Sequence, residues 1–74
     1  MNILWPDYIT STPETLRGKP RIAGTRIPVS LILGYLAEGY STPEIISEFP
    51  DLLPIQIAAC LDYARTLAEY ELAA

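Results

Sequence analysis

The chain has 74 residues, half of them hydrophobic, and a net charge of −4. This length predicts a single domain, residues 1–74, with a core too small to be stable without disulfides, a metal or association. Cys60 is the sole cysteine and histidine is missing from the sequence. An internal disulfide is therefore excluded, and a metal centre and enzymatic acid–base catalysis are disfavoured. We expect no cofactor, no enzymatic activity, and association as a homodimer or with another macromolecule.

The apolar residues come in short groups, none of which approaches the roughly 20 residues that a membrane span needs. Residues 1–7 lack the basic start and the small-residue cleavage site of a signal peptide. We therefore expect no membrane contact and a cytoplasmic location.

The charged residues are unevenly distributed along the chain. Four of the five basic residues, Arg17, Lys19, Arg21 and Arg26, lie within one ten-residue stretch, and seven of the nine acids follow it. The pI near 4.4 repels nucleic acid when the chain is taken whole. A basic N-terminal segment attached to an acidic helical body is nevertheless a pattern typical of binding proteins.

Residues 1–27 carry the signals of an extended arm and a hairpin. Residues 4–5 and 8–10 are candidate strands, separated by Pro6. Residues 11–14, Ser-Thr-Pro-Glu, form a capping-box pattern that predicts about one helical turn, ended by Gly18 and Pro20.

A turn over residues 23–26 lies between Arg21-Ile22 and Ile27. A four-residue loop places Ile22 opposite Ile27, with both side chains facing inward. A two-residue loop would place Arg21 opposite Arg26, and like charges directly opposed are unfavourable. We therefore predict the longer loop.

Residues 28–74 show the periodicity of three helices. The first begins at Pro28, has Val29, Ile32, Leu33, Leu36, Ala37 and Tyr40 on one face, and stops at Gly39. Ser-Thr-Pro-Glu at residues 41–44 opens a second, short helix with Ile45, Ile46 and Phe49 inside. Pro54 starts a third helix that runs to about residue 70, with an inner stripe of Ile57, Cys60, Leu61, Ala64, Leu67 and Ala68. The pattern predicts a trihelical, homeodomain-like or winged-helix-like helix-turn-helix domain with a small N-terminal β element.

The twelve residues from Gly18 to Val29, GKPRIAGTRIPV, resemble the GKP-x-I-x-GTRIPV signature of the bacterial family catalogued as domain of unknown function 433. The likeness covers roughly residues 8–65 and continues through Gly39, Ser41, Glu44-Ile45, Phe49-Pro50-Asp51-Leu52 and Ile57 to Ala64. The resemblance implies a homeodomain-like or winged-helix fold and the role of antitoxin beside a PIN-like ribonuclease toxin. Family members often place Thr or Ser before the proline that opens the third helix, whereas this chain has Leu53, so Asp51 is the candidate replacement cap.

The basic residues Arg17, Lys19, Arg21 and Arg26 are candidates for a partner or nucleic-acid surface. The alternative is that they solvate the hairpin or pair with acids of the same domain. For Arg26 we expect a structural role, anchoring the hairpin to the helical body through a glutamate or a carbonyl.

In a helix-turn-helix protein the exposed N-terminal part of the third helix reads DNA. The candidates are Ile55, Gln56, Ala59, Asp62 and Tyr63, of which Gln56 suits adenine and Tyr63 a phosphate. This helix has no Lys or Arg before Arg65, and Asp62 and Glu69 have the spacing of surface partners of Arg65. DNA binding through this helix is therefore weakly supported, because it lacks the counterion-release contribution.

Trp5, Tyr8, Leu31 and Tyr35 are candidates for an apolar patch that binds a second copy or a toxin. The alternative is that they are isolated surface residues, which are common. Cys60 is expected to be a buried small hydrophobe without a histidine to activate it.

The leading hypothesis is a non-enzymatic binding module, the antitoxin component of a type II toxin–antitoxin pair that occludes a PIN-like ribonuclease. The alternative is a helix-turn-helix transcriptional regulator that controls its own operon.

Overall fold

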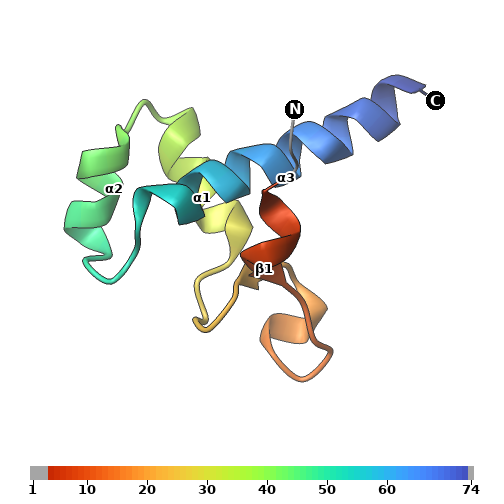
Figure 1. Cartoon of the computed structure of the whole chain (residues 1–74), viewed down its shortest axis with the longest axis horizontal. Helices are drawn as coiled ribbons and strands as arrows, with labels where there is room; N and C mark the ends of the chain where they lie inside the picture. The colour runs from red at the N-terminus through yellow and green to blue at the C-terminus, as the bar shows by residue number, and fades with distance from the viewer. Residues whose placement is uncertain (1–3, 74) are drawn as a thin grey trace.

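The computed structural model describes residues 4–73, with side chains up to residue 69, so residues 1–3 of the expected arm lie outside the described part. The elements are the 3-10 helices η1 (Trp5–Asp7) and η2 (Leu16–Gly18), the strands β1 (Ile9–Thr10) and β2 (Arg21–Ile22), and the helices α1 (Val29–Ala37), α2 (Thr42–Glu48) and α3 (Pro54–Ala73). The described part is therefore mainly helical, with a small antiparallel sheet near its N-terminus, as predicted (Figure 1).

The strand predicted at residues 4–5 is wrong, because Trp5 begins a 3-10 turn instead. Pro6 explains the turn, since its fixed φ suits the start of a helix, where its missing N–H leaves no bond unmade. The strand predicted at residues 8–10 is present as β1. It pairs with β2 in antiparallel register, with Ile9 opposite Ile22.

The four-residue loop of the hairpin is confirmed. The Ile22 amide donates to the Ile27 carbonyl at 3.0 Å. Thr25 closes the loop, because its hydroxyl donates to the Ile22 carbonyl at 2.7 Å and accepts from the Ile27 amide at 3.0 Å. Ile22 is fully buried and Ile27 half-buried, so both isoleucines contribute to the interior.

The helical turn predicted to follow residues 11–14 is absent. Thr12 instead pairs with Thr15 across a tight turn, and Leu16, Arg17 and Gly18 then adopt positive φ values of 52°, 56° and 79°. A right-handed helix here would have had little beyond Leu16 to bury, and short helices without an apolar face are unstable. The segment therefore forms a left-handed turn that projects from the body.

The first two helices are present as predicted, but Ala37 and Tyr40, expected on the inner face of the first, are both exposed. The helix α1 ends at Ala37, so Tyr40 lies beyond it. The predicted stop of α1 at Gly39 is confirmed: its φ is +94°, and its amide donates to the Leu36 carbonyl at 3.0 Å. The capping box that opens α2 is also confirmed, because the Ser41 amide donates to Glu44 Oε1 at 2.8 Å and the Glu44 amide donates to Ser41 Oγ at 3.3 Å.

The third helix, α3, begins at Pro54 as predicted and crosses the whole molecule (Figure 1). Ile57 and Cys60 lie in the core as predicted, and Ala64 is half-buried. The predicted inward positions of Leu61, Leu67 and Ala68 are wrong, because all three side chains are exposed. Nowhere in residues 4–73 is a helix long and apolar enough to cross a membrane.

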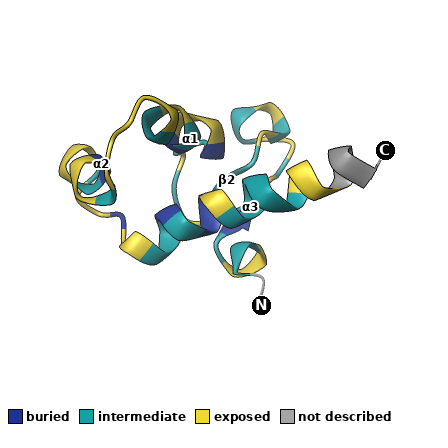
Figure 2. Cartoon of the chain, turned by 90° about the horizontal axis from the view of Figure 1, so that it is seen from above, coloured by how far each residue is buried: buried dark blue, intermediate teal, exposed yellow. Residues whose placement is uncertain are grey.

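Two features of the packing explain the difference in α3. The N-terminal helix η1 packs against α3 and covers its Ala59–Tyr63 flank, so Ala59, expected on the outside, is fully buried. The C-terminal half of α3 extends past the other elements (Figure 2). Leu67, which lies on this half, is 47% exposed. The core joins β1, β2 and the three helices through Ile9, Ile22, Val29, Ile32, Ile45, Leu52, Ile57, Ala59 and Cys60.

Candidate binding surfaces

Exposed carboxylates mark the end of the molecule formed by α2, which we call the acidic end. Glu38 follows α1, Glu44 and Glu48 lie one turn apart on α2, and Asp51 lies in the next turn; all four are exposed. The only ion pairs among the described residues are those of Arg65, on the far half of α3, so the carboxylates of the acidic end are uncompensated.

Two details make the acidic end suitable for a partner. The backbone amide of Ser41 donates to Glu44 and lowers the pKa of that carboxyl group, which keeps it ionised. Exposed apolar side chains, Tyr40 and Leu53, lie in the loops on either side of α2. Charged groups beside exposed apolar ones are the usual composition of a protein interface.

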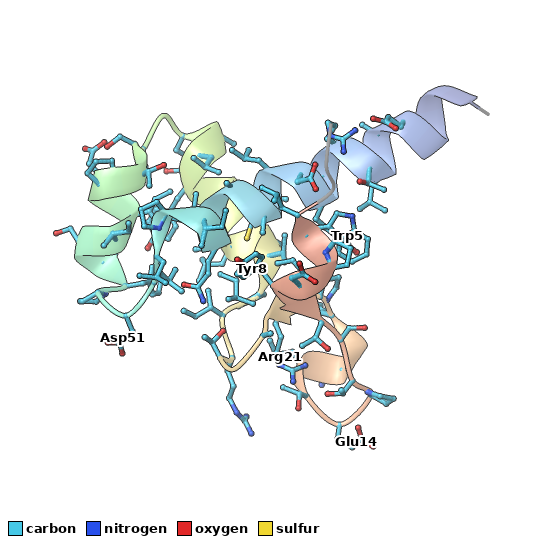
Figure 3. The ribbon with its side chains drawn as sticks, in the orientation of Figure 1. Trp5, Tyr8, Glu14, Arg21 and Asp51 are labelled. Atoms are coloured by element: carbon cyan, nitrogen blue, oxygen red, sulfur yellow. The ribbon has the colours of Figure 1, made fainter. Side chains whose placement is uncertain are left out.

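The basic residues separate into two groups. Arg17, Lys19 and Arg26 are exposed, and no hydrogen bond or ion pair joins their side chains to another described residue; we call them the basic lobe. Arg21 is half-buried, and its guanidinium donates to the Thr25 carbonyl at 3.0 Å and to Thr12 Oγ1 at 3.2 Å (Figure 3). The anchor to the helical body expected at Arg26 is therefore not seen among the described residues, and Arg21 instead joins the hairpin loop to Thr12 of the N-terminal segment.

Asp62 attaches the N-terminal segment to α3. One carboxylate oxygen accepts from the backbone amides of Leu4 and Trp5, at 2.8 and 3.3 Å, and the other accepts from Arg65 at 2.8 and 3.0 Å. The hydrogen bond from Arg65 is the main reason why the pKa of Asp62 lies below its ordinary value, and the two amides lower it further. The expected pairing of Arg65 with Asp62 and Glu69 is present.

Tyr63 belongs to the same junction. Its ring meets that of Trp5 edge to face, with the centroids 5.0 Å apart. Tyr63 was a candidate phosphate contact, and the structure shows it half-buried between η1 and a groove described below.

Gln56, the candidate for adenine, caps α3. Leu53 occupies the N-cap position of α3, and its backbone amide donates to Gln56 Oε1 at 2.7 Å. A side-chain N-cap would accept from the amides of the first turn of α3, and among the described residues no hydrogen bond joins the Asp51 carboxylate to them, so the replacement cap expected at Asp51 is not formed. The Gln56 amide donates instead to the Leu53 carbonyl at 3.0 Å. With Ala59 buried and Asp62 bonded to the N-terminal segment, few groups of this half of α3 are free to read a base.

The four residues of the expected apolar patch are not brought together. Trp5 packs on Tyr63, whereas Tyr35 packs edge to face against Tyr40 and Phe49, beside α2. Tyr8 packs against the core, and Leu31 is exposed on α1. Their contacts place Trp5, Tyr8 and Tyr35 in the interior packing, so Leu31 is the member most available to a partner.

An apolar groove, which the sequence analysis did not predict, lies between α1 and the projecting half of α3. Its volume is about 410 Å³. The lining residues are Lys19, Pro20, Val29, Ser30, Leu33, Tyr63 and Leu67. Lys19 belongs to the basic lobe, so one wall of this α1–α3 groove carries a positive charge.

Cys60 is fully buried, as expected, and burial raises the pKa of its thiol to about 11. Within residues 4–73 no three cysteine, aspartate or glutamate side chains come together in a way that would hold a metal ion.

These features define a small helix-turn-helix-like domain with an acidic end, a group of exposed basic residues and an apolar groove. The family model described as "Protein of unknown function (DUF433)" matches residues 9–64, and the chain belongs to this family. A crystal structure of a DUF433 member from Anabaena variabilis ATCC 29413 superposes with a TM-score of 0.76 and 31% identity, over 84% of this chain and 61% of that one.

A second relative is the uncharacterized protein y4eO of Sinorhizobium fredii (strain NBRC 101917 / NGR234). It is 33% identical over 59 residues, which are 80% of this chain and 27% of y4eO. The chain therefore spans about a quarter of that relative and less than two thirds of the solved one.

Proposed function

We propose that this chain is a non-enzymatic binding module that acts as an antitoxin, covering the RNA-binding groove of a PIN-like ribonuclease. The observation that carries the proposal is the uncompensated acidic end around α2. A ribonuclease must attract a polyanion, so the groove that leads to its active site is basic. The acidic end, with Tyr40 and Leu53 beside it, has the charge and apolar area to occupy such a groove in place of RNA.

The resemblance of residues 18–29 to the DUF433 signature supports the same role, because it implies an antitoxin paired with a PIN-like toxin. The mechanism is steric: Tyr40 and Leu53 are buried against the partner, and the surrounding carboxylates set orientation and association rate. The binding protein would contribute no reacting group.

The experiment mixes the purified chain with the purified product of its neighbouring gene, which the proposal expects to be a PIN-like ribonuclease. The two purified proteins should co-elute in size-exclusion chromatography, and RNA cleavage should stop at equimolar chain. Replacing Glu48→Gln together with Asp51→Asn should slow association several-fold, with a smaller difference at high salt. The matched control is Asp7→Asn with Glu14→Gln, which removes the same charge from exposed positions away from α2. Separate elution of the native proteins, or equal slowing in both variants, would reject the proposal.

A second candidate is an operator-binding regulator. One observation favours it: Arg17, Lys19 and Arg26 are exposed and unpaired among the described residues. DNA would then contact these loops rather than α3, whose N-terminal half carries no cation. A gel shift with the upstream DNA at low salt tests this candidate. Retardation that is lost on changing all three to alanine supports it, and absence of retardation rejects it.

A further inference from the structure

The exposed side of α1 is poor in charge and carries one large apolar side chain. The exposed residues of α1 and its C-cap are Ser30, Leu31, Gly34, Ala37 and Glu38. Glu38 is the charged member of this set, and Leu31 is 41% exposed. The buried residues of the helix, Val29 and Ile32, face the core (Figure 2). A helix face turned to water is ordinarily polar or charged, so this composition is typical of a face that meets another helix.

A hollow of about 310 Å³ lies on this exposed face. Its lining residues are Ser30, Leu31, Gly34, Tyr35 and Glu38. Positions 31, 34, 35 and 38 have the i, i+3, i+4, i+7 spacing of four neighbours on a helix, and four such neighbours form the hole that receives a side chain in knobs-into-holes packing. Gly34 deepens this hole, because it has no Cβ and a Cβ built there would meet nothing within 4 Å.

The knob, Leu31, and the hole face in the same direction. Successive residues of a helix are about 100° apart around its axis, so the mean direction of positions 31, 34, 35 and 38 lies within about 10° of Leu31. The centre of the hole lies about 5 Å further along α1. Two antiparallel copies of α1, related by a two-fold axis level with Leu33, therefore place each Leu31 opposite the hole of the other copy. A face with this property is complementary to itself, as a two-fold interface requires.

The charged end of the same face also has a partner in this arrangement. Glu38 is turned only about 20° from Leu31, and with the axis level with Leu33 it lies level with Pro28 of the other copy. Pro28 is the N-cap of α1 and provides no side-chain acceptor for the first amides of the helix. These amides carry partial positive charge and favour a carboxylate beside them. Glu38 has no ion pair among the residues that the structure describes.

We propose that the exposed face of α1 binds the same face of a second copy of this chain, with the two helices antiparallel and each Leu31 in the hollow of the other copy. A helix of nine residues is about 14 Å long, so the two helices bury less than the ~800 Å² per partner of a standard interface. The dimer is therefore weak and forms as the protein concentration rises. This inference is independent of the proposed function, because a toxin can bind a monomer and the dimer can form without a toxin.

Sedimentation equilibrium of the 74-residue chain from about 10 μM to about 1 mM tests the proposal. The average mass should rise from 8.2 kDa toward twice that value. Leu31→Gln removes the knob at equal helix propensity and should raise the dimer dissociation constant by at least about tenfold. The matched control is Leu61→Gln, the same replacement at a leucine of α3 that is 50% exposed and lies outside the hollow. This control should associate like the native chain.

Gly34→Gln separates the contact between copies from folding. Glutamine is a better helix former than glycine, so in dilute solution the variant should unfold at the same or a higher urea concentration than the native chain. Its side chain would fill the hollow, so self-association should be lost. A purely structural role for Gly34 would move folding and association in the same direction.

A charge replacement tests the antiparallel arrangement. Glu38→Gln should raise the dissociation constant by about threefold or more, because each dimer loses two contacts between a carboxylate and a helix N-terminus. The matched control is Asp7→Asn, which removes the same charge from an exposed position outside this face. It should not weaken the dimer, since a smaller net charge reduces the repulsion between two chains of net charge −4.

Four results would each overturn the proposal. They are a native chain that stays monomeric at the highest concentration, a Leu31→Gln or a Gly34→Gln variant that associates like the native chain, and equal effects of Glu38→Gln and Asp7→Asn. A monomeric chain whose complex with the toxin is lost on Leu31→Gln would assign the hollow to the toxin instead. That result would leave the proposed function standing.

Discussion

The Asp62 carboxylate accepts a hydrogen bond from the backbone amide of Leu4 at 2.8 Å, across 58 positions of the chain. The same oxygen accepts from the Trp5 amide, and Arg65 holds the other oxygen. The Asp62 side chain is only 10% exposed. One ionised carboxylate therefore fixes the start of the described chain to the middle of α3, and with it the contact between Trp5 and Tyr63.

This contact predicts a specific loss of stability in acid. The pKa of Asp62 is lowered in the folded chain from the ordinary 3.8, mainly by Arg65. Its contribution is therefore fully present above pH 3.8 and is lost as the pH falls from there through the folded pKa. Glu44 acts in the same direction, since its pKa is also lowered. We expect the urea concentration at the unfolding midpoint to decrease as the pH drops below 3.8. In the Asp62→Asn variant this decrease should be smaller.

The measurement is a series of urea titrations from pH 6 down to about pH 2, in which the fluorescence of Trp5 monitors unfolding. Asp51→Asn is the matched control, because it removes an exposed carboxylate that has no hydrogen bond to another described residue. The assignment fails if Asp51→Asn flattens the curve as much as Asp62→Asn does. At neutral pH, Asp62→Asn should also speed hydrogen exchange at the Leu4 and Trp5 amides.

Two glycines of the first helical segment should respond in opposite directions to alanine. Gly34 is exposed inside α1, and an added Cβ meets nothing within 4 Å. Gly34→Ala should therefore stabilise the chain by about 0.5–1 kcal/mol through higher helix propensity. Gly39 has equal space but a φ of +94°, so Gly39→Ala should destabilise it by about 1 kcal/mol. Urea unfolding measures both, and shifts of the same sign would contradict the conformational argument.

The left-handed turn at η2 gives a second conformational test. Arg17 has a φ of 56°, which costs a side-chain-bearing residue about 1–2 kcal/mol. Arg17→Gly removes this strain but adds backbone freedom to the unfolded chain, so we expect a net gain of up to about 1 kcal/mol. Lys19→Gly removes the same charge at a φ of −65° and should destabilise the chain. Equal effects of the two changes on the free energy of unfolding would show that charge, not strain, decides.

The tetrapeptide Ser-Thr-Pro-Glu shows how far a local signature predicts structure. It occurs at residues 11–14 and 41–44, yet only the second copy caps a helix. Ile45, Ile46 and Phe49 follow the second copy and give its helix an apolar face, whereas Leu16 stands nearly alone after the first. The deciding quantity is the apolar surface that the following residues can bury. The presence of periodic apolar residues after the second tetrapeptide, and their absence after the first, therefore distinguishes the copy that caps a helix from the copy that does not.

Periodicity and turn chemistry predicted the helices and the hairpin loop, because these depend on neighbours in the sequence. The contacts of Asp62 and the burial of Ala59 depend on η1 packing against α3, some 50 to 60 positions apart. The groove depends on α1 packing against α3, which are also distant in the sequence. A carboxylate beside Arg65 has the pattern of an ordinary surface pair, and nothing in its spacing indicates that two distant backbone amides will bind it. Asp62 accepts from the Leu4 and Trp5 amides only because the tertiary packing brings them together.

The buried thiol of Cys60 provides the last prediction, at alkaline pH. Burial raises its pKa from 9.0 to about 11, so the folded chain keeps the proton where the unfolded chain releases it. The stability due to the neutral thiol is therefore fully present below pH 9 and declines as the pH rises through 11. Cys60→Ala removes this group, and its unfolding midpoint should fall less steeply over that interval, although the lost sulfur contacts lower it at neutral pH.

A thiol-specific disulfide reagent gives an independent measurement, because the thiolate is the attacking form. At pH 8 only about one thiol in a thousand is ionised when the pKa is about 11, and the side chain is 0% exposed. The native chain should therefore react more than about a hundredfold more slowly than the chain in urea. Fast labelling of the folded chain would show instead that the core opens readily, because the Cys60 side chain is 0% exposed within the core.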